Sequence, residues 1–140
     1  MSIDDRRGSA PQICLRSHGH LTRFAASFAY EGEYAVFALA EGGSIGIDLV
    51  NGNTSFDWRE TARLYLGGAE SQRIEQCSPD QQIREFFRAW SGLEARLKCL
   101  GLPLQEWTID LAQQLEQCQI AHVVLEQSYM CAIATLFYAK

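Results

Sequence analysis

The sequence has 140 residues, the length of one globular domain, which excludes an enzyme built from separate cofactor and substrate domains. Hydrophobic residues make up 47% and charged residues 21% of the chain, a composition that excludes a largely disordered protein. Twelve Lys and Arg against 17 Asp and Glu give a net charge of −5, which argues against binding nucleic acid or a membrane surface through bulk positive charge.

The chain begins with a polar approach segment, residues 1–23, ahead of a more apolar domain over 24–140. No apolar stretch of a secretion signal follows the charged residues Asp4 to Arg7, and no run of about 18 apolar residues occurs. We therefore expect a cytoplasmic protein without a membrane segment. The cysteines are odd in number and never spaced as Cys-x-x-Cys, which excludes a zinc ribbon or a disulfide scaffold; they are Cys14, Cys77, Cys99, Cys118 and Cys131.

Three strands are predicted in the first part of the domain. Two apolar runs, Phe24 to Tyr30 and Tyr34 to Ala40, flank Glu31-Gly32-Glu33 and predict a hairpin. Alternation and β-branched residues predict a third strand over Ile45 to Val50, and we interpret Gly42-Gly43 before it as another hairpin turn.

Helical spacing of apolar residues replaces the strand pattern in the middle of the chain. A short helix is predicted from Asp57 to Leu66, ended by Gly67-Gly68. A long amphipathic helix is predicted from about Pro79 to Leu100. Its buried face should consist of Phe86, Phe87, Trp90, Leu93 and Leu97.

Three further strands are expected after the long helix. They span Glu106 to Leu111, Ile120 to Glu126 and Tyr129 to Tyr138, and the last two should pair through Gln127-Ser128. We expect all six strands to form one antiparallel sheet packed on the long helix, which is an α+β fold.

Most residues that could carry chemistry have an ordinary structural interpretation. His18, His20 and His122 are not near a serine or cysteine in a nucleophile pattern, so surface or packing roles are favoured for them. The glycines between Gly42 and Gly46 join two strands without opening a helix, which excludes a dinucleotide or P-loop interpretation.

Two acidic residues stand out because their surroundings are apolar. Asp48 interrupts the Ile45 to Val50 strand, and Glu94 lies within the long helix, one turn before Lys98. Each has an ordinary interpretation when taken alone. A Glu and a Lys four residues apart form a common helix pair, and an Asp near a strand end often bonds to a turn.

Taken together, these residues resemble the two signature motifs of the 4′-phosphopantetheinyl transferases. The first motif reads Gly46-Ile47-Asp48, and the second reads Trp90-Ser91-Gly92-Leu93-Glu94-Ala95-Arg96-Leu97-Lys98. The resemblance extends over about Phe24 to Lys140 and is greatest to the C-terminal half of the surfactin-synthetase-activating type. It implies an α+β half-domain in which the antiparallel sheet packs on the long helix.

The resemblance implies transfer of 4′-phosphopantetheine from coenzyme A to a serine of an acyl or peptidyl carrier protein, with release of 3′,5′-ADP. Asp48 and Glu94 would hold Mg²⁺, which prefers oxygen ligands and accepts one or two carboxylates plus phosphate oxygens. Lys98 would contact the diphosphate, and Glu94 or a water on the metal would take the serine proton. His20 stands in place of the family's Gly-Lys-Pro or Gly-Arg-Pro cation and would help to bind coenzyme A.

Several departures from the family pattern keep a second hypothesis open. Phe28 replaces the family histidine that contacts a coenzyme A phosphate, and Leu93 replaces the lysine before Glu94. Val50 stands where the surfactin type has a second acid, as an apolar residue does in the short holo-acyl-carrier-protein synthase type. The alternative is a non-catalytic relative that acts as a carrier-protein or synthase interaction module. Because the chain has one half of a two-half cleft, we expect a homo-oligomer, or else a partner chain.

Overall fold

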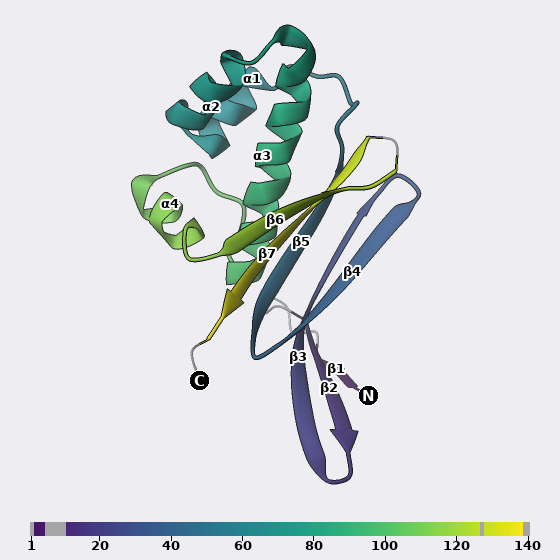
Figure 1. Ribbon diagram of the computed structural model, residues 1–140. Helices are drawn as coiled ribbons and strands as arrows, with labels where there is room; N and C mark the ends of the chain where they lie inside the picture. The colour runs from purple at the N-terminus through teal and green to yellow at the C-terminus, as the bar shows by residue number, and fades with distance from the viewer. Residues whose placement is uncertain (1, 5–10, 127, 139–140) are drawn as a thin grey trace.

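The computed structural model describes residues 2–4, 11–126 and 128–138, which form two antiparallel sheets and five helical segments (Figure 1). The four-stranded sheet has the order β1-β2-β3-β4 and consists of β1 (Ser2–Asp4), β2 (Gln12–Ser17), β3 (His20–Glu31) and β4 (Tyr34–Glu41). The three-stranded sheet has the order β5-β7-β6 and consists of β5 (Gly43–Asn51), β6 (Gln119–Val124) and β7 (Tyr129–Phe137). The expected α+β class is confirmed.

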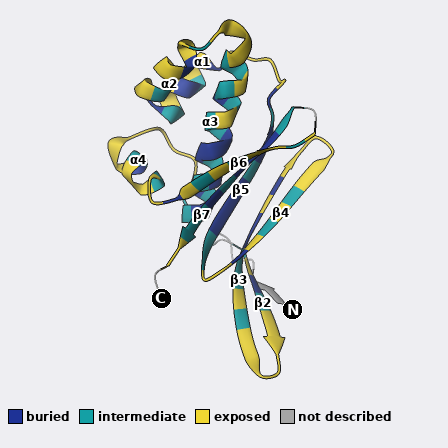
Figure 2. Cartoon of the chain, in the orientation of Figure 1, coloured by how far each residue is buried: buried dark blue, intermediate teal, exposed yellow. Residues whose placement is uncertain are grey.

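The helices gather on one side of the three-stranded sheet, and the β3–β4 hairpin lies on its other side (Figure 1). The helical segments are α1 (Arg59–Thr61), the π-helical turn η1 (Ala62–Leu66), α2 (Gly68–Glu75), α3 (Pro79–Leu100) and α4 (Ile109–Leu115). The inner strands and the inner face of α3 are the most buried parts of the molecule (Figure 2). One apolar cluster lies between β5 and the hairpin, and a second lies between α3 and β7.

The long helix matches its prediction in both bounds and orientation. It begins at Pro79 and ends before Gly101, whose φ of +67° is the left-handed conformation that terminates helices. Of its expected buried face, Phe86, Leu93 and Leu97 are buried. Phe87 and Trp90 are half-buried.

The prediction of one six-stranded sheet was wrong, and so was the hairpin interpretation of Gly42-Gly43. The chain turns at Gly42, where φ is +75°, and β5 then pairs with β7 instead of β4. The amide of Ile47 donates to the Ser27 hydroxyl at 3.0 Å, so a side chain from β3 satisfies a donor on β5. This contact explains how β5 packs beside the hairpin without joining its hydrogen-bond ladder.

The structure corrects the predicted helix before Gly67. Only Arg59–Thr61 is α-helical, and the chain continues as the π-helical turn to Leu66. Gly67 has a φ of +85° and interrupts the helix as expected, but α2 starts at once from Gly68, where no helix was predicted. Its Ile74 is fully buried against Phe86 of α3, a tertiary contact that the eight-residue segment does not reveal alone.

The predicted strand over Glu106 to Leu111 was also wrong. The Thr108 hydroxyl accepts a hydrogen bond from the Leu111 amide at 3.1 Å, and this N-cap starts α4. Leu111 is buried against Leu93 and Leu97 of α3. Capping and helix packing therefore override the apolar alternation of the segment.

The other predicted strands are confirmed. Segments β3 and β4 pair in the register that places Phe28 opposite Phe37, and β6 pairs with β7. Of the approach segment, residues 12–17 form β2, whereas residues 1 and 5–10 lie outside the described part of the chain, as does Gln127 of the expected last turn. No helix in the described residues is long and apolar enough to cross a membrane.

Candidate functional site

Strand β5 presents Gly46 and Asp48 to helix α3 because side chains alternate between the two faces of a strand. Ile45, Ile47 and Leu49 point the other way, into the apolar cluster beneath the hairpin. Gly46 lies directly against the α3 backbone, where a Cβ would overlap Ala95 O and Cys99 N. The absent side chain therefore lets α3 approach β5 closely.

This close approach brings Lys98 to Asp48, as the combined motifs predict. Lys98 Nζ is 3.2 Å from Asp48 Oδ1 and donates a second hydrogen bond to the Ile47 carbonyl at 2.9 Å. The Asp48 side chain is 14% exposed and that of Lys98 is 37% exposed. The pair forms one rim of a candidate site between β5 and α3.

Burial leaves the Asp48 charge only partly compensated. Burial raises the pKa of Asp48 to about 6, even though Lys98 acts in the opposite direction through its charge and its hydrogen bond. The negative charge of Glu94 raises this pKa further. Glu94 and Lys98 are one helical turn apart and therefore share a side of α3.

Asp48 and Glu94 are the side chains of this site that could hold a divalent cation. Asp48 Oδ2 accepts no side-chain hydrogen bond from the described residues, and a backbone hydrogen bond from Leu49 also acts on this carboxylate. The described residues contain no cluster of three or more acids, histidines or cysteines that could hold a metal. Two carboxylates are nevertheless sufficient for Mg²⁺ when phosphate oxygens and waters complete its coordination.

The raised pKa of Asp48 predicts that the metal-free protein loses stability as the pH rises through about 6. Between the unfolded pKa of 3.8 and about 6, the folded protein retains a proton that the unfolded chain releases. We expect Asp48→Asn to unfold with a free energy larger than wild type by about 2–3 kcal/mol near pH 8, and equal to it near pH 4. Urea titrations with a metal chelator measure this difference.

The exposed Glu106 provides the matched control for this comparison. Glu106→Gln should leave the unfolding free energy unchanged at both pH values. An Asp48→Asn protein no more stable than wild type near pH 8 would show that Lys98 compensates the buried charge fully.

The fold does not bring His20 to this site within one chain. Ser27 is the β3 residue that bonds to β5, and His20 lies seven residues earlier, at the exposed far end of the β2–β3 hairpin. At about 3.3 Å per residue, that separation is about 23 Å along the strand. Figure 1 shows this hairpin extending away from the helices.

Two of the departures from the family pattern, Phe28 and Leu93, lie among apolar side chains. Phe28 is 52% exposed on the outer face of the hairpin. Its ring packs against the ring of Phe37, with 4.7 Å between the ring centroids. Leu93 is buried against Leu111 of α4. Both positions therefore carry apolar contacts.

The sequence did not predict that the Ser27 hydroxyl and the Ile47 carbonyl belong to the site. The Ser27 hydroxyl holds the Ile47 amide, and the Ile47 carbonyl accepts from Lys98, so a buried serine fixes the strand at the residue before Asp48. The only signal in the sequence was a polar residue within the apolar run from Phe24 to Tyr30.

Residues 44–134 match the 4′-phosphopantetheinyl transferase superfamily, and this range contains Asp48, Glu94 and Lys98. The match covers more than half of the chain. The chain belongs to this superfamily.

Individual relatives are distant and longer than this chain. The 4′-phosphopantetheinyl transferase AcpT of Salmonella typhimurium is 25% identical over 99 residues, which cover 67% of this chain and 52% of AcpT. AcpT of Escherichia coli K12 is 27% identical over 75 residues, covering 54% of this chain and 38% of the relative. A putative 4′-phosphopantetheinyl transferase of Synechocystis, slr0495, is 27% identical over 73 residues, which cover 52% of this chain and 30% of slr0495. The chain thus spans about half the length of the Salmonella AcpT that it matches, and a smaller share of the other two relatives.

Proposed function

We propose that this superfamily member transfers 4′-phosphopantetheine from coenzyme A to a serine of an acyl or peptidyl carrier protein in a Mg²⁺-dependent reaction. The observation that carries the proposal is the contact between Asp48 and Lys98 across β5 and α3, with the Glu94 charge acting on the same carboxylate. Lys98 and Asp48 are 50 positions apart in the sequence, and their contact in a chain of this superfamily supports the proposal.

Asp48 and Glu94 would hold Mg²⁺, which when bound neutralises charge on the diphosphate of coenzyme A. The Lys98 side chain is 37% exposed, and its ammonium group can turn from Asp48 Oδ1 to the diphosphate oxygens. Burial of Asp48 keeps water away from this carboxylate, which strengthens its attraction for a cation.

In the proposed reaction, the serine oxygen of the carrier protein attacks the phosphorus that bears the pantetheine group. A new oxygen–phosphorus bond forms, and the bond to the bridging oxygen breaks, so that 3′,5′-ADP leaves with the electron pair. Glu94 would accept the serine proton, which is the role of a general base within reach of the attacking hydroxyl. Transfer thus needs no oxidant or reductant.

Incubation of the protein with coenzyme A, Mg²⁺ and an apo carrier protein is expected to add one phosphopantetheine group to the carrier. Intact-mass spectrometry of the carrier measures the product directly. The reaction should stop with excess chelator and resume when Mg²⁺ is added in excess, because the two carboxylates need the ion to bind the diphosphate.

The alternative function is a non-catalytic module that binds a carrier protein or a synthase. It is favoured by the apolar residues Phe28 and Leu93 where the family has a histidine and a lysine. Binding of apo carrier protein without any mass change, in the presence of coenzyme A and Mg²⁺, would support this alternative and contradict the transferase proposal.

An exposed apolar surface on the hairpin supports the proposed homo-oligomer. Phe28, Tyr30, Phe37 and Leu39 are 46% to 82% exposed and lie on adjacent strands, since Phe28 pairs with Phe37. Contiguous apolar surface of this kind commonly marks an interface. The match with AcpT covers 52% of that relative, and in the proposed oligomer a second copy would complete the cleft.

Light scattering at micromolar concentration is expected to give a mass above the 15.7 kDa of one chain. Phe37→Ser should lower this mass toward that of a monomer, because it places a polar group in the interface. Val124, which is 59% exposed on β6, provides the control, and Val124→Ser should leave the mass unchanged. A strict monomer, with and without coenzyme A, would contradict the homo-oligomer.

A further inference from the structure

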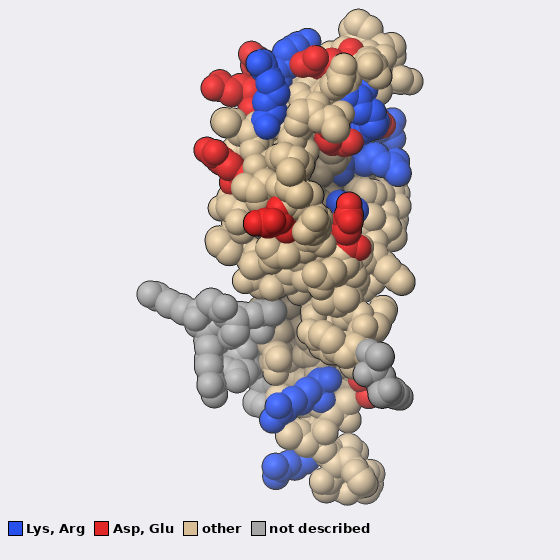
Figure 3. Space-filling view, turned by 90° about the vertical axis from the view of Figure 1, so that its left-hand side faces the viewer, with Lys and Arg blue, Asp and Glu red and all other residues tan. Residues whose placement is uncertain are grey.

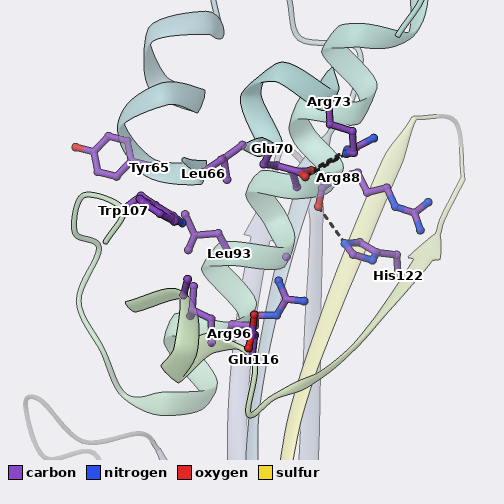
Figure 4. A pocket seen from close by; sticks show the side chains of 14 residues that line it. Tyr65, Leu66, Glu70, Arg73, Arg88, Leu93, Arg96, Trp107, Glu116 and His122 are labelled. Carbon is purple, nitrogen blue, oxygen red and sulfur yellow. Dashed lines mark hydrogen bonds and ion pairs between the residues drawn. The ribbon is translucent and has the colours of Figure 1, made fainter. Parts of the chain in front are cut away.

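A cavity lies on the opposite side of α3 from Asp48. Its volume is about 400 Å³, within the range of small-molecule sites, and it is bounded by η1, α2, α3, α4 and β6 (Figure 4). Gly92 and Arg96 line it from α3, whereas Lys98, two residues after Arg96, contacts Asp48. Two residues correspond to about 200° around a helix, so the two sites occupy opposite faces of α3.

One wall of the cavity is apolar and held in place by backbone contacts. Trp107 lies on this wall, with Leu93 beside it (Figure 4). The Trp107 amide donates to the Leu64 carbonyl at 2.8 Å. The Trp107 ring packs on Gly67 so closely that a Cβ there would lie 2.8 Å from it. The apolar wall is therefore formed before any ligand arrives.

The other side of the cavity carries three arginines, Arg73, Arg88 and Arg96, and two carboxylates, Glu70 and Glu116. Arg73 is paired with Glu70 at 2.8 Å and with Glu85 at 3.0 Å. Arg88 and Arg96 form no ion pair within the described part of the chain. Acidic and basic side chains are interspersed over the face of the molecule in Figure 3, so an anion would be attracted by local groups rather than by a field of one sign.

Arg96 supplies a buried donor without an acceptor. Its Nε is shielded from solvent and has no hydrogen-bond partner among the described residues. A buried polar group left without a partner costs about 1–3 kcal/mol, and more when it is charged. An anionic ligand in the cavity would offer an acceptor for this guanidinium group.

His122 shows that the two guanidinium groups act on the same region. Burial lowers the pKa of His122, and the charges of Arg88 and Arg96 lower it further. His122 Nε2 donates to the Arg88 carbonyl at 3.0 Å, which ties β6 to α3 beside the cavity. The charges of Arg88 and Arg96 therefore both act at His122.

We infer that this cavity binds a small organic anion, with its carboxylate or phosphate group at Arg88 and Arg96 and its apolar body against Trp107 and Leu93. Guanidinium groups match both oxyanions through paired N–H donors. The inference is independent of the proposed transferase activity, since it uses no residue of the Asp48 site.

Phenyl phosphate and benzoate are suitable probes because each joins an oxyanion to a flat apolar ring. We expect both to bind the full-length protein in calorimetric titrations, at least tenfold more tightly than inorganic phosphate, with the tighter of the two identifying the preferred oxyanion. The indole N–H signal of Trp107 in NMR spectra should shift in the same titrations. Benzyl alcohol, which lacks the charge, should bind at least tenfold more weakly.

Arg96→Gln is expected to weaken binding of the preferred probe at least tenfold. Arg88→Gln tests the same charge at an exposed position and should have a similar effect even if Arg96→Gln is unstable. Arg63→Gln is the matched control, since Arg63 is exposed and does not line this cavity. Equal binding by the Arg88 and Arg63 variants, equal binding of benzyl alcohol, or loss of probe binding in Lys98→Ala would overturn the inference.

Discussion

Asp48→Ala is expected to lower the rate of phosphopantetheine transfer by at least about 10²–10³-fold, and Glu94→Ala should do the same. Both substitutions remove a carboxylate that the proposal assigns to Mg²⁺. Asp48→Ala should leave the fold intact. The raised pKa of Asp48 indicates that burying its charged carboxylate destabilises the folded protein, so its removal should not unfold the chain. Initial rates from the intact mass of the carrier protein, at saturating Mg²⁺, measure the loss.

Three further variants separate a metal role from a general effect on the site. Asp48→Asn keeps the shape of the side chain but not its charge, so it should be as inactive as Asp48→Ala. Lys98→Ala should raise the coenzyme A concentration needed for half-maximal rate, while Mg²⁺ still binds. Glu106→Ala, at an exposed acid, should match wild type. A rate for Asp48→Ala within threefold of wild type would remove Asp48 from the mechanism.

The elements with strong and consistent local signals could be predicted from the sequence. The long helix has a proline at its first position, an apolar stripe and a terminating glycine, and all three agree with the observed bounds Pro79–Leu100. The Ile45 to Val50 strand has both alternation and β-branched residues, and it lies within β5. In each case several independent local preferences indicate the same structure.

The errors occurred where tertiary contacts decide between local alternatives. The segment that becomes α4 reads as a strand by alternation, but Thr108 caps it as a helix and α3 accepts its buried Leu111. The division into two sheets depends on the bond from Ile47 to Ser27, which joins residues 20 positions apart. No local pattern contains such a contact.

The residues of the candidate site could be selected from the sequence only because two motifs occurred together. Asp48 and Lys98 are indeed adjacent, and the role of Gly46 as the point where α3 crosses β5 became visible only in three dimensions. His20 was selected from its position relative to a family motif, and its hairpin extends away from the site. Sharing of one ion by Asp48 and Glu94 stays a prediction.

Gly46→Ala is expected to destabilise the protein by about 3 kcal/mol or more, the upper end of the cost of overpacking a tight interior. The added methyl group would overlap Ala95 O and Cys99 N, which are backbone atoms of α3 and cannot rotate away as a side chain could. To relieve the overlap, the helix must move off β5. Urea unfolding of the variant, followed by circular dichroism, measures the loss of stability.

Gly68 provides the matched control for this glycine, because a Cβ added there meets nothing within 4 Å. Gly68→Ala should therefore leave stability unchanged or raise it by up to about 1 kcal/mol, since alanine is the better helix former. Movement of α3 away from β5 would also separate Lys98 Nζ from Asp48 Oδ1, now 3.2 Å apart, so the fraction of Gly46→Ala that remains folded should transfer phosphopantetheine poorly. A stable and fully active Gly46→Ala protein would show that the close contact of α3 with β5 is not what assembles the site.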